Sequence, residues 1–218
     1  MRLDLSRGIE PRPGVGVERS SPPRTAKGEA GRGRRVLGVD PGTVVTGWGV
    51  VEDGDEGMGC VASGVVRLRG DRAERLARIH RTLCEVCERF RPDVVVVEKS
   101  FVGDNVQTAF RLGEARGAVM VAAVHAGLSV AEYSPAEIKV AVAGNGRAAK
   151  EQMQIMVARL LALSGALAGD EADALGAAIC HLHTHSFTAR VREVRERHGR
   201  SSLQDRVRKQ AVARFKVP

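Results

Sequence analysis

Residues 36–53 read VLGVDPGTVVTGWGVVED, and this stretch predicts how the fold begins. The apolar run Val36–Asp40 predicts a buried strand, and Pro41-Gly42-Thr43 directly after it predicts a turn. A second strand is expected over Gly47–Glu52, and a third over Cys60–Leu68, beyond a polar turn. Three consecutive strands joined by short turns indicate an antiparallel meander.

Further along, the chain alternates helices with strands. Apolar residues at helical spacing predict a helix over Arg72–Phe90, which Pro92 ends. The run Asp93–Glu98 contains four consecutive valines, so it predicts a central strand that is covered on both faces. Further helices are expected over Gln107–Ala126, from Pro135 onward, over Ala148–Leu163 and over Asp170–His185, with a strand over Leu128–Tyr133. The pattern predicts an α/β fold with a mixed five-stranded sheet, three antiparallel strands followed by parallel ones, flanked by helices.

Basic charge is concentrated at the two ends of the chain. Residues 1–35 carry a net charge of +5 and residues 186–218 one of +7, whereas residues 36–185 carry −4. The first segment is rich in Gly, Pro, Arg and Ser, so we expect a disordered basic extension. We therefore divide the chain into this extension (1–35), a folded domain (36–185) and a basic C-terminal tail (186–218). The basic ends indicate attraction to a polyanion, most simply nucleic acid.

Composition argues against several other classes of protein. The longest apolar runs, such as Ala118–Val124, are far shorter than the ~20 residues that a membrane span needs. The N-terminus lacks the apolar segment of a secretory signal, and four scattered cysteines fit a reduced, cytoplasmic protein. Seven aromatic residues in 218 are too few for a surface that binds nucleic acid mainly by base stacking.

Four acidic residues lie at positions where a charged carboxylate is energetically unfavourable, which indicates that they have a function. Asp40 and Glu98 each end an apolar strand, and Asp170 and Asp173 lie three residues apart on one face of the last helix. Carboxylates crowded into one pocket raise each other's pKa unless a cation lies between them. An all-oxygen site suits Mg²⁺, with Mn²⁺ as a substitute. Two such ions about 3.5–4 Å apart can catalyse hydrolysis of a phosphodiester.

Several motifs together resemble one family of nucleases. They are Val36-Leu-Gly-Val-Asp-Pro-Gly-Thr43 with Thr46-Gly-Trp-Gly-Val50; Val97-Glu98 with Phe101, Asn105 and Arg111–Gly117; Lys139, Gly144, Gly146 and Lys150; and Asp170–Leu175 with Ala177 and His181. In order and spacing they are similar to the motifs of RuvC-type Holliday-junction resolvases, over about residues 36–185. The motif Asp-Pro-Gly-Thr alone would be weak evidence for this family, because the sequences of sugar kinases and Hsp70-like ATPases begin with a similar motif.

The resemblance implies a ribonuclease H-like fold and a Mg²⁺-dependent, structure-selective DNA endonuclease of homologous recombination and DNA repair. The carboxylates that it implies for catalysis and for binding two Mg²⁺ ions per subunit are Asp40, Glu98, Asp170 and Asp173. It also implies that Lys139 and Lys150 contact the DNA backbone near the scissile phosphate. Phe101 would be a wedge that stacks on a base at the opened crossover.

The same resemblance implies partners. The family acts as a homodimer that nicks two strands of a four-way junction symmetrically and leaves 5′-phosphate and 3′-hydroxyl ends. We expect the helix over Gln107–Ala126 to provide the dimer surface, because Gly113, Ala115 and Gly117 permit close approach, while its other face can pack on the sheet. Coupling to the RuvA–RuvB branch-migration complex is also implied, whereas a cytoplasmic location and no membrane association are expected from the composition.

Three other functions share part of this pattern. The main alternative is a ribonuclease H-like nuclease that acts on RNA or an RNA–DNA hybrid, because the acidic set is shared across that fold. A phosphotransferase or ATPase would need a duplicated second half, for which 218 residues leave no room. A non-catalytic junction-binding protein would not be expected to keep all four carboxylates.

Two groups of metal-binding residue types are interpreted as structural. Cys84-x-x-Cys87 has no second cysteine pair, and Cys87 falls on the apolar helix face, so we expect no zinc or redox role. In the series His181, His183 and His185, only the first and last share a helix face, so a metal-binding tract is not expected. That one of these histidines lies close to the acidic site and assists it stays an alternative.

Overall fold

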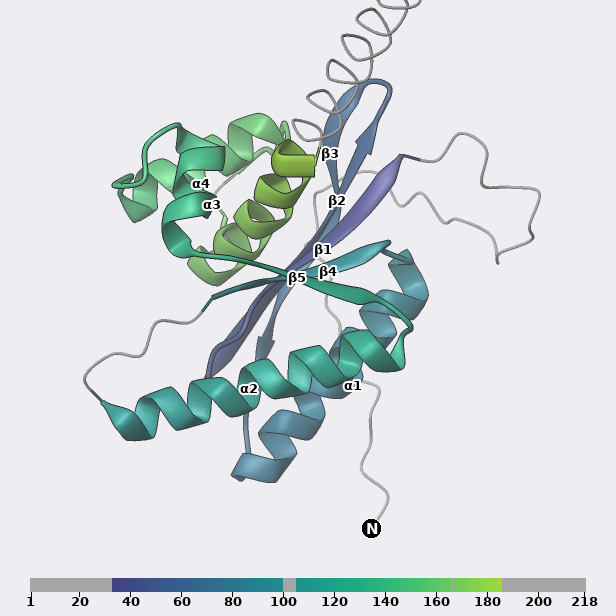
Figure 1. Cartoon of the computed structure of the whole chain (residues 1–218), viewed down its shortest axis with the longest axis vertical. Helices are drawn as coiled ribbons and strands as arrows, with labels where there is room; N and C mark the ends of the chain where they lie inside the picture. Colours follow the sequence, from purple (N-terminus) through teal and green to yellow (C-terminus); the bar gives the residue numbers. More distant parts are fainter. Residues whose placement is uncertain (1–32, 100–104, 166, 186–218) are drawn as a thin grey trace, which may run out of the picture. The chain divides into compact units, whose positions relative to one another are not determined.

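The computed structural model describes residues 33–99, 105–165 and 167–185 (Figure 1). The chain divides into two compact units, residues 1–182 and 183–218, and the sheet lies in the first. The strands are β1 (Arg34–Asp40), β2 (Val45–Gly54), β3 (Gly57–Arg67), β4 (Val94–Glu98) and β5 (Ser129–Tyr133). The helices are α1 (Arg72–Phe90), α2 (Val106–His125), α3 (Pro135–Ala143) and α4 (Lys150–Leu160), followed by a helix over residues 169–185.

The five strands form one mixed sheet in the order β3-β2-β1-β4-β5. β1, β2 and β3 pair antiparallel, whereas β4 runs parallel to both β1 and β5. The predicted α/β fold with three antiparallel strands followed by parallel ones is therefore confirmed. β1 and β4 lie at the centre of the sheet, where a parallel pair buries both of its faces.

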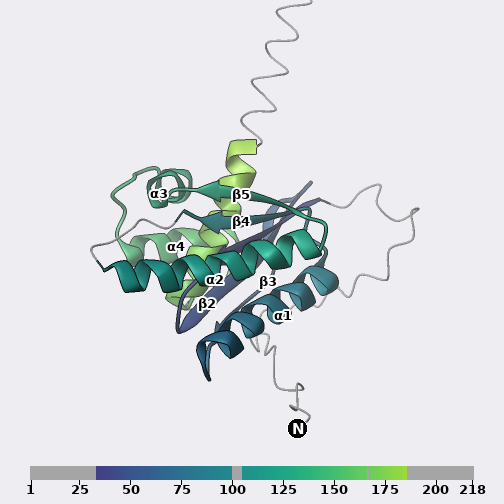
Figure 2. The ribbon, with the colours of Figure 1, turned by 60° about the horizontal axis from the view of Figure 1, so that its bottom comes forward.

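Helices cover both faces of the sheet, as the two ribbon views in Figures 1 and 2 show. On one face, α1 and α2 bury Leu83 and Val119 against Val39 and Val97 of the central strands. On the other face, α3, α4 and the helix over residues 169–185 pack on the alternate residues of the same strands. All four valines of β4 are at most 3% exposed, which confirms that this strand is covered on both sides.

The element boundaries differ from the sequence prediction by a few residues. β1 begins at Arg34 rather than Val36, because Arg35 is buried. Its guanidinium lies 2.5 Å from the Glu52 carboxylate and donates to the backbone carbonyl of Phe90 at 2.8 Å. A charged residue that would end an apolar strand is thus held inside the sheet by its partners. β3 begins at Gly57, three residues before the predicted start.

The helix ends follow local capping chemistry. Ser134 and Glu137 form a reciprocal capping box at the start of α3, where Pro135 is the first helical residue. Asn105 caps α2 by accepting from the backbone N–H of Thr108 at 3.1 Å. α4 is shorter at both ends than the predicted Ala148–Leu163.

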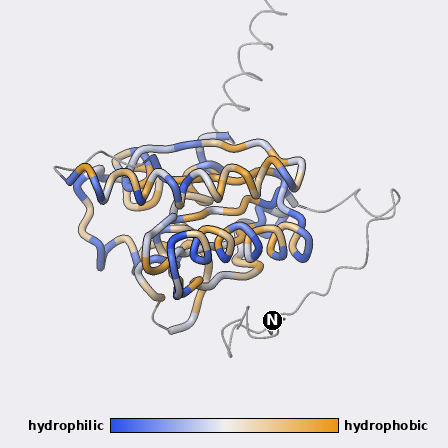
Figure 3. Tube along the Cα trace, turned by 90° about the horizontal axis from the view of Figure 1, so that it is seen from below, coloured by the Kyte–Doolittle hydropathy of each residue, from blue (hydrophilic) through white to orange (hydrophobic). Residues whose placement is uncertain are grey.

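Hydropathy follows the same layered arrangement. Figure 3 shows helices whose turns alternate between hydrophilic and hydrophobic segments, as expected for helices with one face on a sheet. Within the described part of the chain, no helix is long and apolar enough to cross a membrane.

Candidate active site

Asp40 and Glu98 lie at neighbouring strand ends. β1 and β4 are parallel, and their register pairs the residues that directly precede these two acids. Side chains alternate along a strand, so Asp40 lies on the same face as Val36, and Glu98 on the same face as Val94. Both valines belong to the core beneath the helix over residues 169–185. The two carboxylates therefore emerge side by side toward that helix.

Glycines let the helix over residues 169–185 lie directly on the sheet. Gly47 pairs with Asp40 across β1 and β2, and a Cβ at Gly47 would lie 1.9 Å from the backbone oxygen of Asp170. A Cβ at Gly38 would lie 1.9 Å from the backbone oxygen of Ala174. Contacts this close are possible only where the strand residue has no side chain. They bring the acidic start of the helix, including Asp173, against the ends of the central strands.

The electrostatics indicate that the other three predicted carboxylates lie within interaction range of Asp40. The pKa of Asp40 is raised to about 7, first by burial and then by the negative charges of Asp173, Glu98 and Asp170. The pKa of Glu98 is also raised, first by burial and then by Asp173. Asp40 and Glu98 therefore lie in an environment that disfavours the ionised form of a carboxyl group.

Two predicted lysines line the same site. Lys150 Nζ lies 3.3 Å from Asp173 Oδ2, and this neighbour raises the pKa of the lysine. Together with Lys139, Glu98 and Asp173, it lines a cavity of about 260 Å³ between α3, α4 and the end of β4. The side chain of Lys150 remains 57% exposed, so the ammonium group is accessible to a ligand that enters the cavity.

The donor set fits a hard divalent cation. The four carboxylates carry more negative charge than the two lysines offset, and a cation would relieve the repulsion that raises the pKa values of Asp40 and Glu98. Within the described residues, no three of these carboxylates place oxygen atoms all within 4.8 Å of one another. The fit therefore rests on the chemistry and charge of the donors.

A residue that the sequence analysis did not single out holds the end of β4 in place. Arg116 of α2 donates to the backbone carbonyl of Glu98 at 2.5 Å and forms an ion pair with Glu132 of β5. Its side chain is only 16% exposed, so both interactions are partly shielded from water. Arg116 lies in the predicted motif Arg111–Gly117, but its spacing in the sequence does not indicate which backbone group it reaches.

Phe101 and His181 also belong to the motifs found in the sequence. Phe101 lies outside the described residues. His181 is buried and lies 3.0 Å from the hydroxyl of Tyr133 and 3.4 Å from the guanidinium of Arg34. Tyr133 pairs with Glu98 across β4 and β5, whereas Arg34 begins β1 and Asp40 ends it. His181 therefore contacts a residue at the Glu98 end of the sheet and another at the opposite end.

The raised pKa of Asp40 predicts how stability depends on pH when divalent ions are removed. In EDTA, folded Asp40 keeps its proton up to about pH 7, whereas in the unfolded chain it loses the proton near its ordinary value of 3.8. Because the folded state binds the extra proton, this group's contribution to stability is present below pH 4 and lost as the pH rises through 7. Between pH 5 and 8, the free energy of unfolding should fall by on the order of 2 kcal/mol more than in Asp40→Asn.

Denaturant titrations of both proteins at several pH values in EDTA measure this difference. The cause assigned to the pKa shift is wrong if the two proteins show the same dependence on pH.

Comparison with known proteins identifies the family. The family model described as "Crossover junction endodeoxyribonuclease RuvC" matches residues 36–181. A crossover junction endodeoxyribonuclease RuvC from Alkalilimnicola ehrlichii is 50% identical over 159 residues, which cover 72% of this chain and 96% of the relative. A RuvC of the same description from Halorhodospira halophila is 51% identical over 154 residues, covering 70% and 92% of the two chains.

Solved structures agree with the sequence comparisons. The structure of Thermus thermophilus RuvC is 38% identical, has a TM-score of 0.65 and covers 71% of this chain and 96% of its own. The same protein in complex with a Holliday junction substrate matches with 36% identity, the same TM-score and the same coverage. The predicted ribonuclease H-like fold is thereby confirmed. With a family model over most of the folded region and relatives that are half identical, the chain belongs to the RuvC family of crossover junction endodeoxyribonucleases.

Proposed function

We propose that this protein is a structure-selective DNA endonuclease that resolves four-way junctions in homologous recombination and DNA repair. The observation that carries the proposal is the convergence of four acidic residues at the ends of β1 and β4 and on the helix over residues 169–185, in a chain of the RuvC family. The structure of the T. thermophilus relative with a Holliday junction substrate supports the substrate class.

The proposed metal ligands are the four carboxylates, Asp40, Glu98, Asp170 and Asp173. We expect two Mg²⁺ ions per subunit, with Mn²⁺ as a substitute, because hard oxygen donors of high charge density suit these ions. When bound, such ions lower the pKa of an attacking water and neutralise the charge that develops on the leaving oxygen.

The remaining roles belong to side chains of this protein. Lys139 and Lys150 line the cavity beside Glu98 and Asp173, so a phosphate entering it would meet two ammonium groups next to the acidic cluster. A lysine acts on a phosphate as a mobile point charge and can hold it against carboxylates that would otherwise repel it. Arg116 acts as a positioning residue, because it fixes the backbone that carries Glu98.

The direct test is cleavage of a synthetic four-way DNA junction, compared with linear duplex DNA, an RNA–DNA hybrid and RNA. Paired symmetric nicks on the junction alone, present with Mg²⁺ and absent with EDTA, are expected. Cleavage of the hybrid or of RNA instead would agree with the proposed metal site but would show that the substrate is the one expected for the ribonuclease H-like alternative.

Phe101 is proposed as the wedge at the opened crossover. Phe101→Ala should bind an intact junction with little loss but cut it at least about 10-fold more slowly, since stacking on a base is worth about 1–3 kcal/mol. A junction with unpaired bases at its centre should restore the rate. A variant that stays equally slow on that pre-opened junction would show that Phe101 has a different role.

We propose a homodimer that uses an apolar stripe along α2. The stripe consists of Val106, Phe110, Gly113, Gly117, Val121 and Val124, which recur three or four residues apart on one helix face. Ala115, which the sequence placed on this surface, is instead buried in the core against the sheet. The larger side chains of the stripe are 60–71% exposed, and a Cβ on either glycine would meet nothing within 4 Å. A row of apolar and small residues turned to solvent suits close contact with another helix. A second copy of the chain fits the two-fold symmetry of a four-way junction.

Val121→Asp should disrupt this dimer, because it buries an unpaired charge in the interface. A penalty of about 3 kcal/mol would weaken dimerisation at least about 100-fold and replace paired nicks by single ones. Ile155→Asp is the matched control, since Ile155 is 53% exposed on α4, outside the stripe. Analytical ultracentrifugation measures both variants. If Val121→Asp dimerises as tightly as Ile155→Asp, the dimer interface does not include the stripe on α2.

Two further proposals concern partners and location. Coupling to the RuvA–RuvB branch-migration complex rests on family membership alone, and a cytoplasmic location rests on the cysteine content and on the family. Pull-down of purified RuvA–RuvB on junction DNA tests the first, and fractionation of the host cell tests the second.

A further inference from the structure

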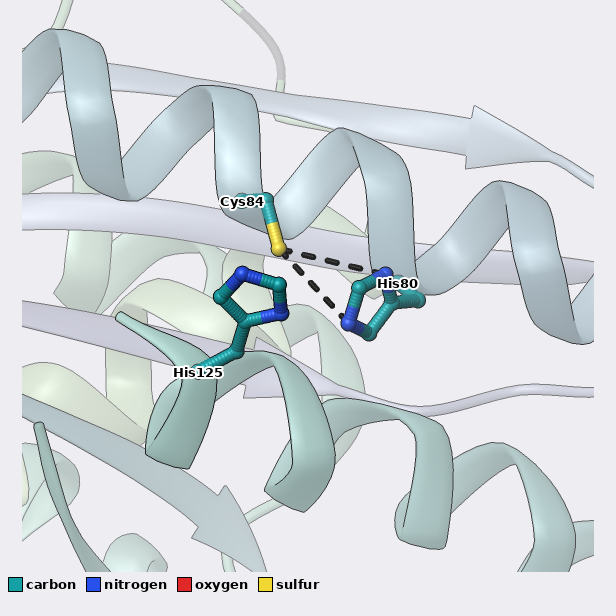
Figure 4. Close-up of side chains that lie close together, drawn as sticks. All are labelled: His80, Cys84 and His125. Atoms are coloured by element: carbon teal, nitrogen blue, oxygen red, sulfur yellow. Dashed lines mark hydrogen bonds between the residues drawn. The ribbon is translucent and has the colours of Figure 1, made fainter. Parts of the chain in front are cut away.

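A histidine–cysteine–histidine cluster lies between α1 and α2, away from the carboxylates. His80 and Cys84 are one helical turn apart on α1, and His125 is the last residue of α2. Figure 4 shows the three side chains pointing toward one another from the two helices. One ligand atom from each of them lies within 4.8 Å of the other two, and they are the only such group of three among the described residues.

The distances within the cluster match those between ligands of a tetrahedral metal ion. Zinc binds sulfur at ~2.3 Å and imidazole nitrogen at ~2.0–2.1 Å, so its ligand atoms lie about 3.5 Å apart. Cys84 Sγ lies 3.8 Å from Nε2 and 3.9 Å from Nδ1 of His80. The rings of His80 and His125 have centroids 5.5 Å apart. Small side-chain rotations would bring the three ligand atoms to one ion.

The donor types also distinguish this cluster from the carboxylate site. One thiolate and two imidazoles are soft or borderline ligands that suit zinc and disfavour Mg²⁺. Cys84 and His125 also line a cavity of about 400 Å³ that leaves room for a water as the fourth ligand. Cys87 lines this cavity too, but it is only 7% exposed and packs in the core.

The cluster lies on the opposite side of the sheet from the acidic site. α1 and α2 cover the face that the four carboxylates do not use. α1 leads into the start of β4 and α2 into the start of β5, whereas Glu98 ends β4. An ion bound between the helices would therefore join two elements of the scaffold without contacting DNA-cleaving groups.

We propose that His80, Cys84 and His125 bind one zinc ion per chain, with water as the fourth ligand, and that this ion clamps the second half of α1 to the end of α2. Binding requires loss of the thiol proton from Cys84, which leaves to solvent as the zinc–sulfur bond forms. Because the ion would bind the folded chain and not the separated helices, it stabilises the fold.

The test uses the full-length protein in excess Mg²⁺, so that the carboxylate site is occupied. Titration with Co²⁺, a spectroscopic substitute for zinc, should give one equivalent of a thiolate-to-cobalt charge-transfer band, which oxygen ligands cannot produce. Zinc should displace the cobalt and remove the band. Zinc at about 100-fold above its Kd should also raise Tm by about 5–10 °C.

Two variants and one control test whether Cys84 and His125 hold the ion. Cys84→Ala should lose the band, and His125→Ala should weaken cobalt binding at least about 10-fold, as expected for loss of one of three protein ligands. Cys60→Ala is the matched control, since Cys60 is another partly buried cysteine but lies on β3, and it should behave as the parent protein. The proposal is wrong if the parent protein gives no charge-transfer band, or if the band persists unchanged in His125→Ala.

Junction cleavage by these variants is a further check. Cleavage with Mg²⁺ at a temperature well below Tm should stay within about twofold of the parent protein, because the clamp acts on the scaffold. A large loss of cleavage in well-folded Cys84→Ala would contradict the separation of the two sites.

Discussion

Asp40→Asn should abolish junction cleavage while junction binding remains. The substitution removes one negative charge and one metal-binding oxygen from the centre of the acidic cluster but keeps the shape of the side chain. Asp40 is the residue that interacts electrostatically with all three other carboxylates and with Lys150. Losing a ligand there should cost several kcal/mol of transition-state stabilisation, or ~10³-fold or more in rate.

Measurements of stability and of junction binding distinguish loss of a metal ligand from damage to the fold. Because burial disfavours the ionised form of Asp40, Asp40→Asn should be as stable as the parent protein in EDTA at pH 8, or more so. Asp55→Asn is the matched control, since it makes the same chemical change at an exposed position in the turn between β2 and β3. Single-turnover cleavage and gel-shift assays measure the two effects separately. Normal cleavage by Asp40→Asn would show that Asp40 is not a ligand of the catalytic metal ions.

The positions of Asp40 and Glu98 could be predicted because strands impose simple rules. Each acid ends an apolar run, and side chains alternate from face to face along a strand. That the two strands are neighbours and parallel is not visible in either run alone. The parallel pairing of β1 with β4 depends on how the elements pack in three dimensions.

The interactions that hold the site in place were harder to foresee. Arg116 reaches the carbonyl of Glu98 and the side chain of Glu132, contacts between residues 16 and 18 positions apart in different elements. Nothing in a helical motif indicates which backbone oxygen a long arginine side chain will meet. Sequence spacing predicts faces of helices and strands, but the partner depends on how the elements pack.

The cysteine motif shows the same limit. Read along the helix, Cys84 pairs naturally with Cys87, and that pair gave no reason to expect a metal site. In three dimensions Cys87 packs in the core, while Cys84 faces His80 from its own helix and His125 from another. The third member is 41 residues further along the chain, and only the packing of α1 against α2 brings it close.

Gly38→Ala should damage both the stability and the activity of the enzyme. Gly38 lies in the middle of β1, two residues before Asp40, where a Cβ would lie 1.9 Å from the backbone oxygen of Ala174. Backbone cannot move aside as a flexible side chain can, so the helix over residues 169–185 must shift away from the sheet. Overpacking of this kind costs about 1–3 kcal/mol. A displacement of about 1 Å in the helix that carries Asp170 and Asp173 should lower the cleavage rate about 10²-fold.

Gly59→Ala makes the same chemical change in the same sheet, at a position in β3 where an added Cβ meets nothing within 4 Å. It should leave cleavage unchanged and keep or slightly raise Tm, because alanine loses less chain entropy than glycine on folding. Thermal unfolding and single-turnover cleavage of both variants, measured below the lower Tm, separate instability from misplacement of the helix. If Gly38→Ala loses stability but still cleaves at the parent rate, the close contact of the helix over residues 169–185 with β1 is not needed for catalysis. In that case side-chain flexibility is enough to bring Asp170 and Asp173 to the metal site.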